Sequence, residues 1–114
     1  MRSAFQKVID SCEPTIGRFS IVWISKDPDC QGRLGMLVTK KKFRDAVQRN
    51  RIKRLIRESF RRIKKDLIED PWDMVVLVTR VSILREKQQS VMHDLFKVCK
   101  KNGILKKKET PVTQ

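Results

Sequence analysis

The segment from Thr39 to Lys65 combines a helical repeat with a dense positive charge. Small and apolar residues in and just after it recur at steps of three and four positions, which places them on one side of a helix: Ile52, Leu55, Ile56, Ser59, Phe60, Ile63 and Leu67. Polar and cationic residues line the opposite side: Asn50, Arg54, Arg57 and Arg61. Asp45 precedes the run, where a carboxylate can accept the first free backbone N–H groups. The pattern predicts a helix that buries one face and presents a cationic ridge on the other.

The charge of this segment distinguishes it from an ordinary exposed helix. Between Lys40 and Lys65, thirteen Lys or Arg residues stand against two acids, Asp45 and Glu58, and the whole chain has a net charge of +14. A solvated basic face is the simpler interpretation, but exposed helices normally mix the two signs. We therefore favour a polyanionic partner, with nucleic acid as the first candidate and an acidic membrane surface as the second.

Length and composition place limits on the rest of the chain. Its 114 residues suffice for one domain with a single core. The longest apolar runs, Ile21–Ile24 and Met74–Val78, are too short for a membrane-spanning helix or a secretory signal. Cys12, Cys30 and Cys99 show no Cys-x-x-Cys spacing, which predicts reduced thiols of a cytoplasmic protein rather than disulfides or a zinc site.

Three elements are predicted before the basic helix. Apolar residues at helical spacing indicate a short first helix over Ser3–Ser11, with Ser3 as its N-cap. Aromatic and β-branched residues predict strands over Arg18–Ser25 and Arg33–Thr39, which are separated by turn-forming residues. We expect these two strands to pair antiparallel as a hairpin.

Three further segments follow the basic helix. A near-continuous apolar run predicts a buried strand over Met74–Thr79, and a last helix is predicted from about Arg85 to Asn102-Gly103. We expect one domain over residues 1–103 and a flexible basic tail over residues 104–114. Helices on only one side of the sheet would leave its other face free for an extended ligand.

Candidate catalytic and metal-binding residues are sparse. His93 is the only histidine, and a lone helical histidine usually has a surface or packing role. Glu69, Asp70 and Asp73 lie at a helix-to-strand junction, where acids usually cap and solubilise rather than bind a metal. The chain has no glycine-rich phosphate-binding motif. We therefore predict no catalytic residue and no metal site in the protein itself.

The centre of the basic helix carries more information than its charge. Guanidinium groups form paired hydrogen bonds with phosphate oxygens, and an asparagine offers a donor and an acceptor to a base edge or a ribose hydroxyl. Lys40-Lys41, Ala46 and the run Arg49-Asn50-Arg51-Ile52-Lys53-Arg54 are followed by Arg57-Glu58-Ser59-Phe60-Arg61. This pattern resembles the signature helix of the protein subunit of bacterial ribonuclease P. The resemblance spans about Phe5 to Gly103 and includes Arg33-Leu34-Gly35 and Asp73.

The resemblance implies an α+β fold, a two-layer α/β sandwich with the order α-β-β-(β)-α-β-α. In that fold the basic helix forms a left-handed β-α-β crossover between parallel strands, as in the second domain of ribosomal protein S5. Such a crossover departs from the right-handed rule that applies to most parallel strand pairs.

The resemblance also implies a function. The catalyst would be an RNA subunit that uses Mg²⁺, bound mainly by that RNA and by substrate phosphates, to remove the 5′ leader of precursor tRNA. The expected partners are this RNA and precursor tRNA, with no membrane and no obligate protein partner. Residues implied to bind the RNA subunit are basic or amide side chains in and before the helix: Lys40, Lys41, Arg44, Arg49, Asn50, Arg51, Lys53, Arg54, Arg57 and Arg61.

A second set of residues is implied for the leader, in a cleft between the first helix and the open sheet face. These residues are Phe5, Ile9 and Val22. The family often has a second aromatic residue at the position of Ile9, so stacking there is expected to be weaker or to shift to another residue. The alternative hypothesis is a plain RNA-binding module, such as a ribosome-associated protein, which would explain the charge but not the combination of motifs.

Overall fold

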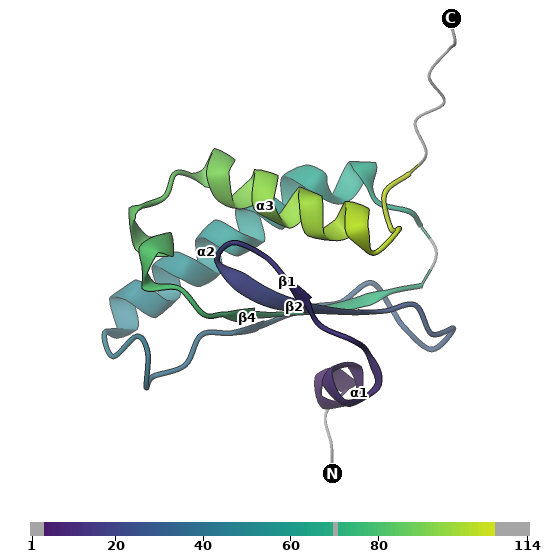
Figure 1. The fold of residues 1–114 in the computed structure, drawn as a ribbon, viewed down its shortest axis with the longest axis horizontal. Coiled ribbons are helices and arrows are strands. Elements are labelled where there is room, and N and C mark those ends of the chain that lie inside the picture. Colours follow the sequence, from purple (N-terminus) through teal and green to yellow (C-terminus); the bar gives the residue numbers. More distant parts are fainter. Residues whose placement is uncertain (1–3, 70, 107–114) are drawn as a thin grey trace, which may run out of the picture.

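The computed structural model describes residues 4–69 and 71–106, in which helices and strands follow the predicted order (Figure 1). The helices are α1 (Ala4–Ser11), α2 (Ala46–Ile63) and α3 (Gln88–Lys101). The strands are β1 (Thr15–Ile16), β2 (Ser20–Ser25), β3 (Leu34–Leu37) and β4 (Asp73–Val78). Short 3₁₀ turns, η1 (Lys64–Asp66) and η2 (Val81–Arg85), follow α2 and β4. The short edge strand β1 precedes the two predicted strands, whereas the expected order placed the optional third strand after them.

The strands form one mixed sheet in the order β1-β2-β4-β3. β4 pairs antiparallel with β2 and parallel with β3, so the predicted hairpin between β2 and β3 is wrong. Every residue of β4 except Leu77 is buried, and a strand that is apolar on both faces is most stable in the middle of a sheet. The parallel β3–α2–β4 unit confirms that the basic helix connects parallel strands. Its left-handed sense stays a prediction.

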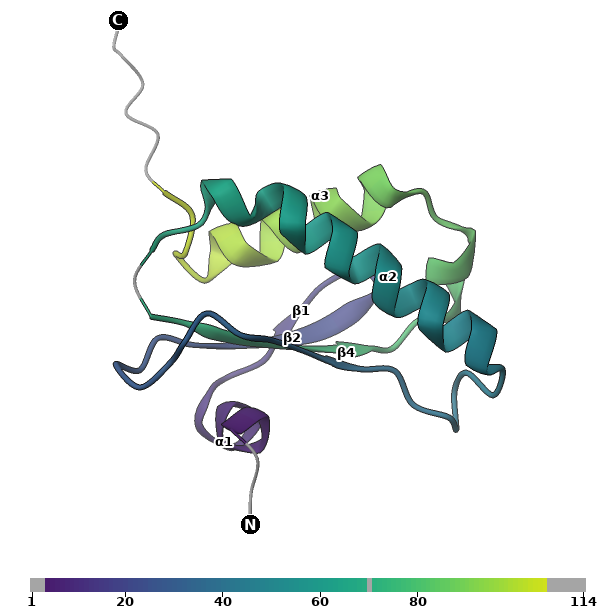
Figure 2. The same ribbon diagram turned by 180° about the vertical axis from the view of Figure 1, so that it is seen from behind.

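The sheet separates two layers of unequal size. α2 and α3 lie over one face, whereas α1 crosses the opposite face, as the two views show (Figures 1 and 2). α1 packs against β2 and β4. The residue pattern predicted helices on only one side of the sheet. This prediction is wrong, because α1 covers part of the face opposite α2 and α3.

The main core lies between the sheet and the layer of α2 and α3. Most of the predicted α2 stripe is buried there, and only Leu55, at its margin, is partly exposed. The Ser59 hydroxyl, fully buried in this stripe, donates to the carbonyl of Leu55 at 2.7 Å, so its burial leaves no unpaired polar group. Asp45 is the N-cap, with a carboxylate oxygen 2.9 Å from the backbone N of Val47, as predicted. The other predicted cap, Ser3, lies outside the described residues.

The chain folds back onto the domain beyond α3. Gly103 adopts a φ of +70° that a glycine tolerates without strain, and this reverses the backbone. Ile104 is then fully buried, and its carbonyl accepts from the N–H of Ile68 at 2.8 Å. The N–H of Lys106 donates to the carbonyl of Asp66 at 2.7 Å. Residues 104–106 therefore belong to the domain rather than to a tail, and residues 107–114 lie outside the described residues.

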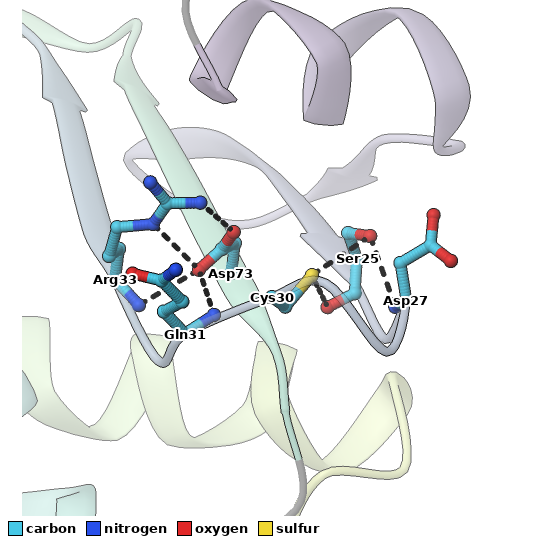
Figure 3. Close-up of polar contacts among 6 residues, drawn as sticks. All are labelled: Ser25, Asp27, Cys30, Gln31, Arg33 and Asp73. Carbon is cyan, nitrogen blue, oxygen red and sulfur yellow. Dashed lines mark hydrogen bonds and ion pairs between the residues drawn. The ribbon is translucent and has the colours of Figure 1, made fainter.

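An ion pair with one buried partner joins the loop before β3 to the start of β4 (Figure 3). The Asp73 side chain is only 3% exposed, and its carboxylate accepts from the backbone N–H of Gln31 at 3.2 Å and of Arg33 at 2.9 Å. The Arg33 guanidinium donates to the same carboxylate at 2.9 Å. Burial alone would raise the pKa of Asp73, but these hydrogen bonds and the Arg33 charge together lower it from the usual 3.8. The pair thereby orients Arg33, which directly precedes β3.

The Asp73 network predicts a pH-dependent loss of stability. Because the folded-state pKa of Asp73 is lowered, its contribution is fully present above the unfolded-state pKa and is lost as pH falls through the folded-state value. Asp73→Asn should lower the free energy of unfolding by about 1.5–3 kcal/mol at pH 7, the scale of hydrogen bonds to a charged group. Urea unfolding at pH 7 and at pH 3 should show the wild-type advantage shrinking at the acidic value. A deficit of equal size at both pH values would contradict this account.

The docking of Ile104 predicts a second effect on stability. Ile104→Ala should cost about 2–5 kcal/mol, because it opens a cavity in a packed core. The matched control is Ile16→Ala, since Ile16 is 75% exposed, and it should change stability by less than about 0.5 kcal/mol. Thermal unfolding of both variants measures the difference. Equal melting temperatures for the two would mean that residue 104 belongs to a frayed tail.

Candidate functional site: two surfaces on opposite sides of the sheet

The outer side of α2 carries an exposed row of polar and cationic side chains. We call this row the α2 ridge, and it consists of Asn50, Arg54, Arg57 and Arg61. One acid partners it: Arg61 contacts both carboxylate oxygens of Glu58, at 2.7 and 2.8 Å. Among the described residues, no other α2 cation forms an ion pair with a carboxylate. The ridge is thus a surface of uncompensated positive charge, held rigidly because the helix beneath it is packed in the core.

The three residues of the Arg-Asn-Arg run do not form one contact surface. Successive helical residues are about 100° apart, so Arg49 and Arg51 lie on different sides of Asn50. Arg49 is partly buried, and its guanidinium donates to the carbonyls of Phe43 at 2.7 Å and Arg44 at 3.0 Å. Asn50 and Arg51 are exposed. Arg49 therefore fixes the loop before α2 to the helix, while its two neighbours face the solvent.

The loop before α2 extends the cationic surface. Lys40, Lys41, Lys42 and Arg44 are all exposed, and the Lys42 ammonium group donates a hydrogen bond to the carbonyl of Thr79 at 2.6 Å. Phe43 is buried in the core and anchors the loop. Among the remaining predicted residues, Lys53 is partly buried at the flank of the ridge. All ten residues implied to bind the RNA subunit thus lie on α2 or on the loop that leads directly into it.

The opposite face of the sheet is organised by Phe5 of α1. Its ring lies directly on β3, since a side-chain carbon added at Gly35 would meet the ring at 2.9 Å. The Arg33 guanidinium carbon lies 5.9 Å from the centre of the same ring. Phe5 remains partly exposed, so one part of the ring is available to a ligand. Ile9, one turn further along α1, is also partly exposed.

The strand register places two rows of side chains across this face. Trp23, Val75 and Gly35 form the first row, and Phe5 lies against it at Gly35. The second row lies two positions away from the first on each strand and consists of Ile21, Leu77 and Leu37. Leu37 is 42% exposed and the other two are partly exposed, which leaves an apolar strip beside α1.

Val22 does not belong to this face. Its side chain is fully buried in the core that α2 and α3 cover, so the implied leader-binding role of Val22 is corrected. Neighbouring strand residues point to opposite faces, and Ile21 and Trp23 are therefore the β2 residues on the open side. The alternation of side chains along the predicted strand is the signal that identifies them. In the sequence, Arg33 stands out only as part of the run Arg33-Leu34-Gly35, which predicts no binding role for it. In the structure, its guanidinium group lies beside the aromatic ring of Phe5.

A small hollow of about 240 Å³ lies between α1 and the loop that connects β2 to β3. Lys7 and Arg33 contribute positive charge to it, and Asp27 and Asp29 contribute negative charge. It adjoins the Arg33–Asp73 pair, so the surface beside α1 has a mixed charge, unlike the uniformly basic ridge on the other side of the sheet.

Residues with catalytic potential do not gather into a centre. His93 is exposed on α3, and Asp73 is already bound to Arg33. Burial raises the pKa of the Cys99 thiol to about 12. Within residues 4–69 and 71–106, no group of three or more His, Cys, Asp or Glu side chains could hold a metal ion. In the same residues, no helix is long and apolar enough to cross a membrane.

Comparison with known proteins gives a consistent result. A family model described as Ribonuclease P matches residues 1–103. The ribonuclease P protein component of Coxiella burnetii is 31% identical over 85 residues, which cover 75% of this chain and 69% of the relative. That of Mycoplasma genitalium is 32% identical over 100 residues, which cover 85% of this chain and 77% of the relative.

Solved structures with the same fold lead to the same family. The ribonuclease P protein from Thermotoga maritima matches with a TM-score of 0.75 and 27% identity, over 89% of this chain and 94% of that one. The protein from Staphylococcus aureus matches with a TM-score of 0.73 and 25% identity, over 93% and 96%. With its cationic α2 helix on a four-stranded mixed sheet, the chain belongs to the ribonuclease P protein family, whose members are components of a tRNA-processing endoribonuclease.

Proposed function

We propose that this protein binds the catalytic RNA of ribonuclease P through α2 and the 5′ leader of precursor tRNA through the open sheet face. The RNA subunit performs the cleavage, and the protein positions the substrate and reduces the repulsion between two polyanions. The observation that carries the proposal is the α2 ridge: exposed cations, almost without acidic partners, on one side of a helix whose other side is buried.

The chemistry of the ridge suits a folded RNA. Arg54 and Arg57 present planar guanidinium groups that can bind phosphate oxygens in pairs, and Asn50 can bind a ribose hydroxyl or a base edge. Lys40, Lys41, Arg44 and Arg51 add positive charge on either side of these contacts. Arg49 contributes indirectly, since it holds the preceding loop against the helix. Displacement of counterions from the RNA by these cations would make binding strongly dependent on salt.

The open face suits an unpaired strand. Phe5 and Trp23 offer aromatic surface for base stacking, and Ile9, Ile21 and Leu37 extend it with apolar contacts. Arg33, fixed by Asp73, is placed to contact a leader phosphate. Ile9 cannot stack as an aromatic ring does, so the proposal assigns the second stacking contact to Trp23. Contacts of this kind tolerate most leader sequences, because every base has a stacking face.

Mg²⁺ enters the proposal as an ion of the RNA. The donor sets within the described residues do not fit a protein-bound ion, so no step is assigned to a metal held by this chain. When bound to the RNA subunit, Mg²⁺ supplies charge stabilisation for hydrolysis of the phosphodiester. The proposal places the protein in the cytoplasm with its RNA and requires no obligate protein partner.

Reconstitution with ribonuclease P RNA tests the proposal. Protein alone should not cleave precursor tRNA, and adding protein to the RNA should lower the Mg²⁺ concentration needed for half-maximal cleavage, because protein cations replace counterions. The control is an RNA of equal length and random sequence. Cleavage by protein freed of all RNA, or an Mg²⁺ requirement that protein leaves unchanged, would contradict the proposal and favour a plain RNA-binding module.

Substitution of Phe5 separates leader binding from binding to the RNA subunit. Phe5→Ala should weaken the affinity of the holoenzyme for leader-bearing precursor tRNA by about 1–3 kcal/mol, the value of one stacked base. Affinity for mature tRNA should remain unchanged. Val8→Ala is the control on the same helix, because Val8 is buried and its truncation should lower stability without selecting between the two tRNAs. Equal losses for leader-bearing and leaderless tRNA, together with a large drop in melting temperature, would make Phe5 a core residue.

A further inference from the structure

A groove of about 930 Å³ lies between the C-terminal end of α2 and α3. The two helices that line it lie on the opposite side of the sheet from α1 (Figure 2). We call it the α2–α3 groove. Arg61, Arg62 and Lys65 line it from α2 and η1, and Gln89, His93 and Phe96 line it from α3. Its volume falls in the range of sites that bind small ligands.

The rim of the groove is cationic. Arg62 and Lys65 are exposed, and within the described part of the chain neither forms an ion pair. Asp66 is the one acidic side chain among the lining residues, against three cations. A groove with this balance favours an anionic occupant such as a phosphate group.

The interior of the groove is aromatic and apolar. Phe96 and Met92 are partly buried against the core, and Ile63 beneath them is 3% exposed. Gln89 and Ser90 place an amide and a hydroxyl at the same edge. A flat apolar surface with hydrogen-bonding groups beside it and cations at its rim matches the parts of one nucleotide: base, ribose and phosphate.

The positive surface continues around the end of α2. A second hollow, of about 740 Å³, shares Arg61 and Lys65 with the groove and is also lined by Lys64 and Lys106. Lys106 is held there because its backbone N–H donates to the carbonyl of Asp66 at 2.7 Å. Arg61 is also a member of the α2 ridge. The ridge, the groove and this hollow therefore share cations at the C-terminal end of α2, where Asp66 and Glu69 are the acidic lining residues.

We propose that the α2–α3 groove binds an unpaired nucleotide of the catalytic RNA, with its base against Phe96 and its phosphate at Arg62 and Lys65. The inference rests on the proposed function, because the RNA that lies along the ridge reaches the groove at Arg61. The leader is the less suitable occupant, since its proposed site lies on the other side of the sheet. The groove thus adds a contact beyond the Arg-Asn-Arg region, at the opposite end of α2.

Three variants test the groove in binding assays with ribonuclease P RNA. Phe96→Leu keeps an apolar side chain but removes the stacking surface, and should weaken affinity by about fivefold or more. Lys65→Gln should reduce the slope of log affinity against log salt by about one unit. Gln89→Glu, at an exposed position, places a carboxylate in the lining of a groove that binds an anionic nucleotide, and should weaken affinity several-fold without affecting the fold.

Matched controls distinguish the groove from general charge and from stability. Lys97→Gln makes the same charge change on α3 outside the groove, and should leave affinity and salt slope unchanged. Circular dichroism confirms that each variant is folded at the assay temperature. Probing of the RNA by 2′-hydroxyl acylation should reveal unpaired nucleotides that wild-type protein protects and that Phe96→Leu and Gln89→Glu leave reactive.

The outcomes separate failure of this inference from failure of the proposed function. If wild-type protein binds ribonuclease P RNA no better than random RNA of equal length, the proposed function fails. Suppose that wild-type protein binds ribonuclease P RNA and that Asn50→Ala lowers this affinity, while the three groove variants bind as Lys97→Gln does. Only the groove inference is then overturned. The groove inference is also overturned if Phe96→Leu alone loses affinity, because a bound nucleotide must respond to the new carboxylate at position 89 as well. If the groove inference alone is overturned, the groove would be open to a different class of partner, such as a protein.

Discussion

The burial of one side of α2 holds the helix layer on the sheet. Ile52, Ile56, Phe60 and Ile63 pack on the sheet and on α3, and Phe60 meets Trp72 edge to face with ring centres 5.5 Å apart. This packing offsets the repulsion among the cations of the other side, which a free helix of this composition would not withstand. It also fixes their direction, because a helix that is locked along one face can present only the opposite face to a partner.

The sheet keeps the two proposed RNA surfaces apart. The α2 ridge lies on one side, and the open face with Phe5 lies on the other, so the RNA subunit and the leader need not compete for the same groups (Figures 1 and 2). The surfaces also differ in chemistry. The ridge offers charge and hydrogen-bond donors for a folded RNA, whereas the open face offers aromatic and apolar surface for unpaired bases. Under the proposed function, the domain would bind the two RNAs on opposite sides of its sheet.

The Arg33–Asp73 pair links the fold to the open face. Asp73 stands at the start of the central strand, and its carboxylate collects the N–H groups of the loop before β3. The same interaction orients the Arg33 guanidinium near the Phe5 ring. An ion pair with one partner this deeply buried is costly to break, since it would leave an uncompensated charge. Its value here is geometric, because it holds a cation in a defined place beside an aromatic ring.

Short-range periodicity was enough to predict the buried stripe and N-cap of α2, the β4 run and the order of elements. Residues three or four apart share a helix face, and a continuous apolar run demands burial. Long-range contacts account for what the amino-acid pattern did not reveal. β4 lies between β2 and β3 because it is apolar on both faces, whereas local turn signals favoured a hairpin. Val22 faces the main core rather than the leader side, and Ile104 fills the core near Ile68 although its basic surroundings predict a tail. Alternation along the strand separates Val22 from Ile21 and Trp23, but which of these two sets faces the core depends on the tertiary structure. The strand order and the burial of Ile104 likewise depend on contacts between residues far apart in the chain.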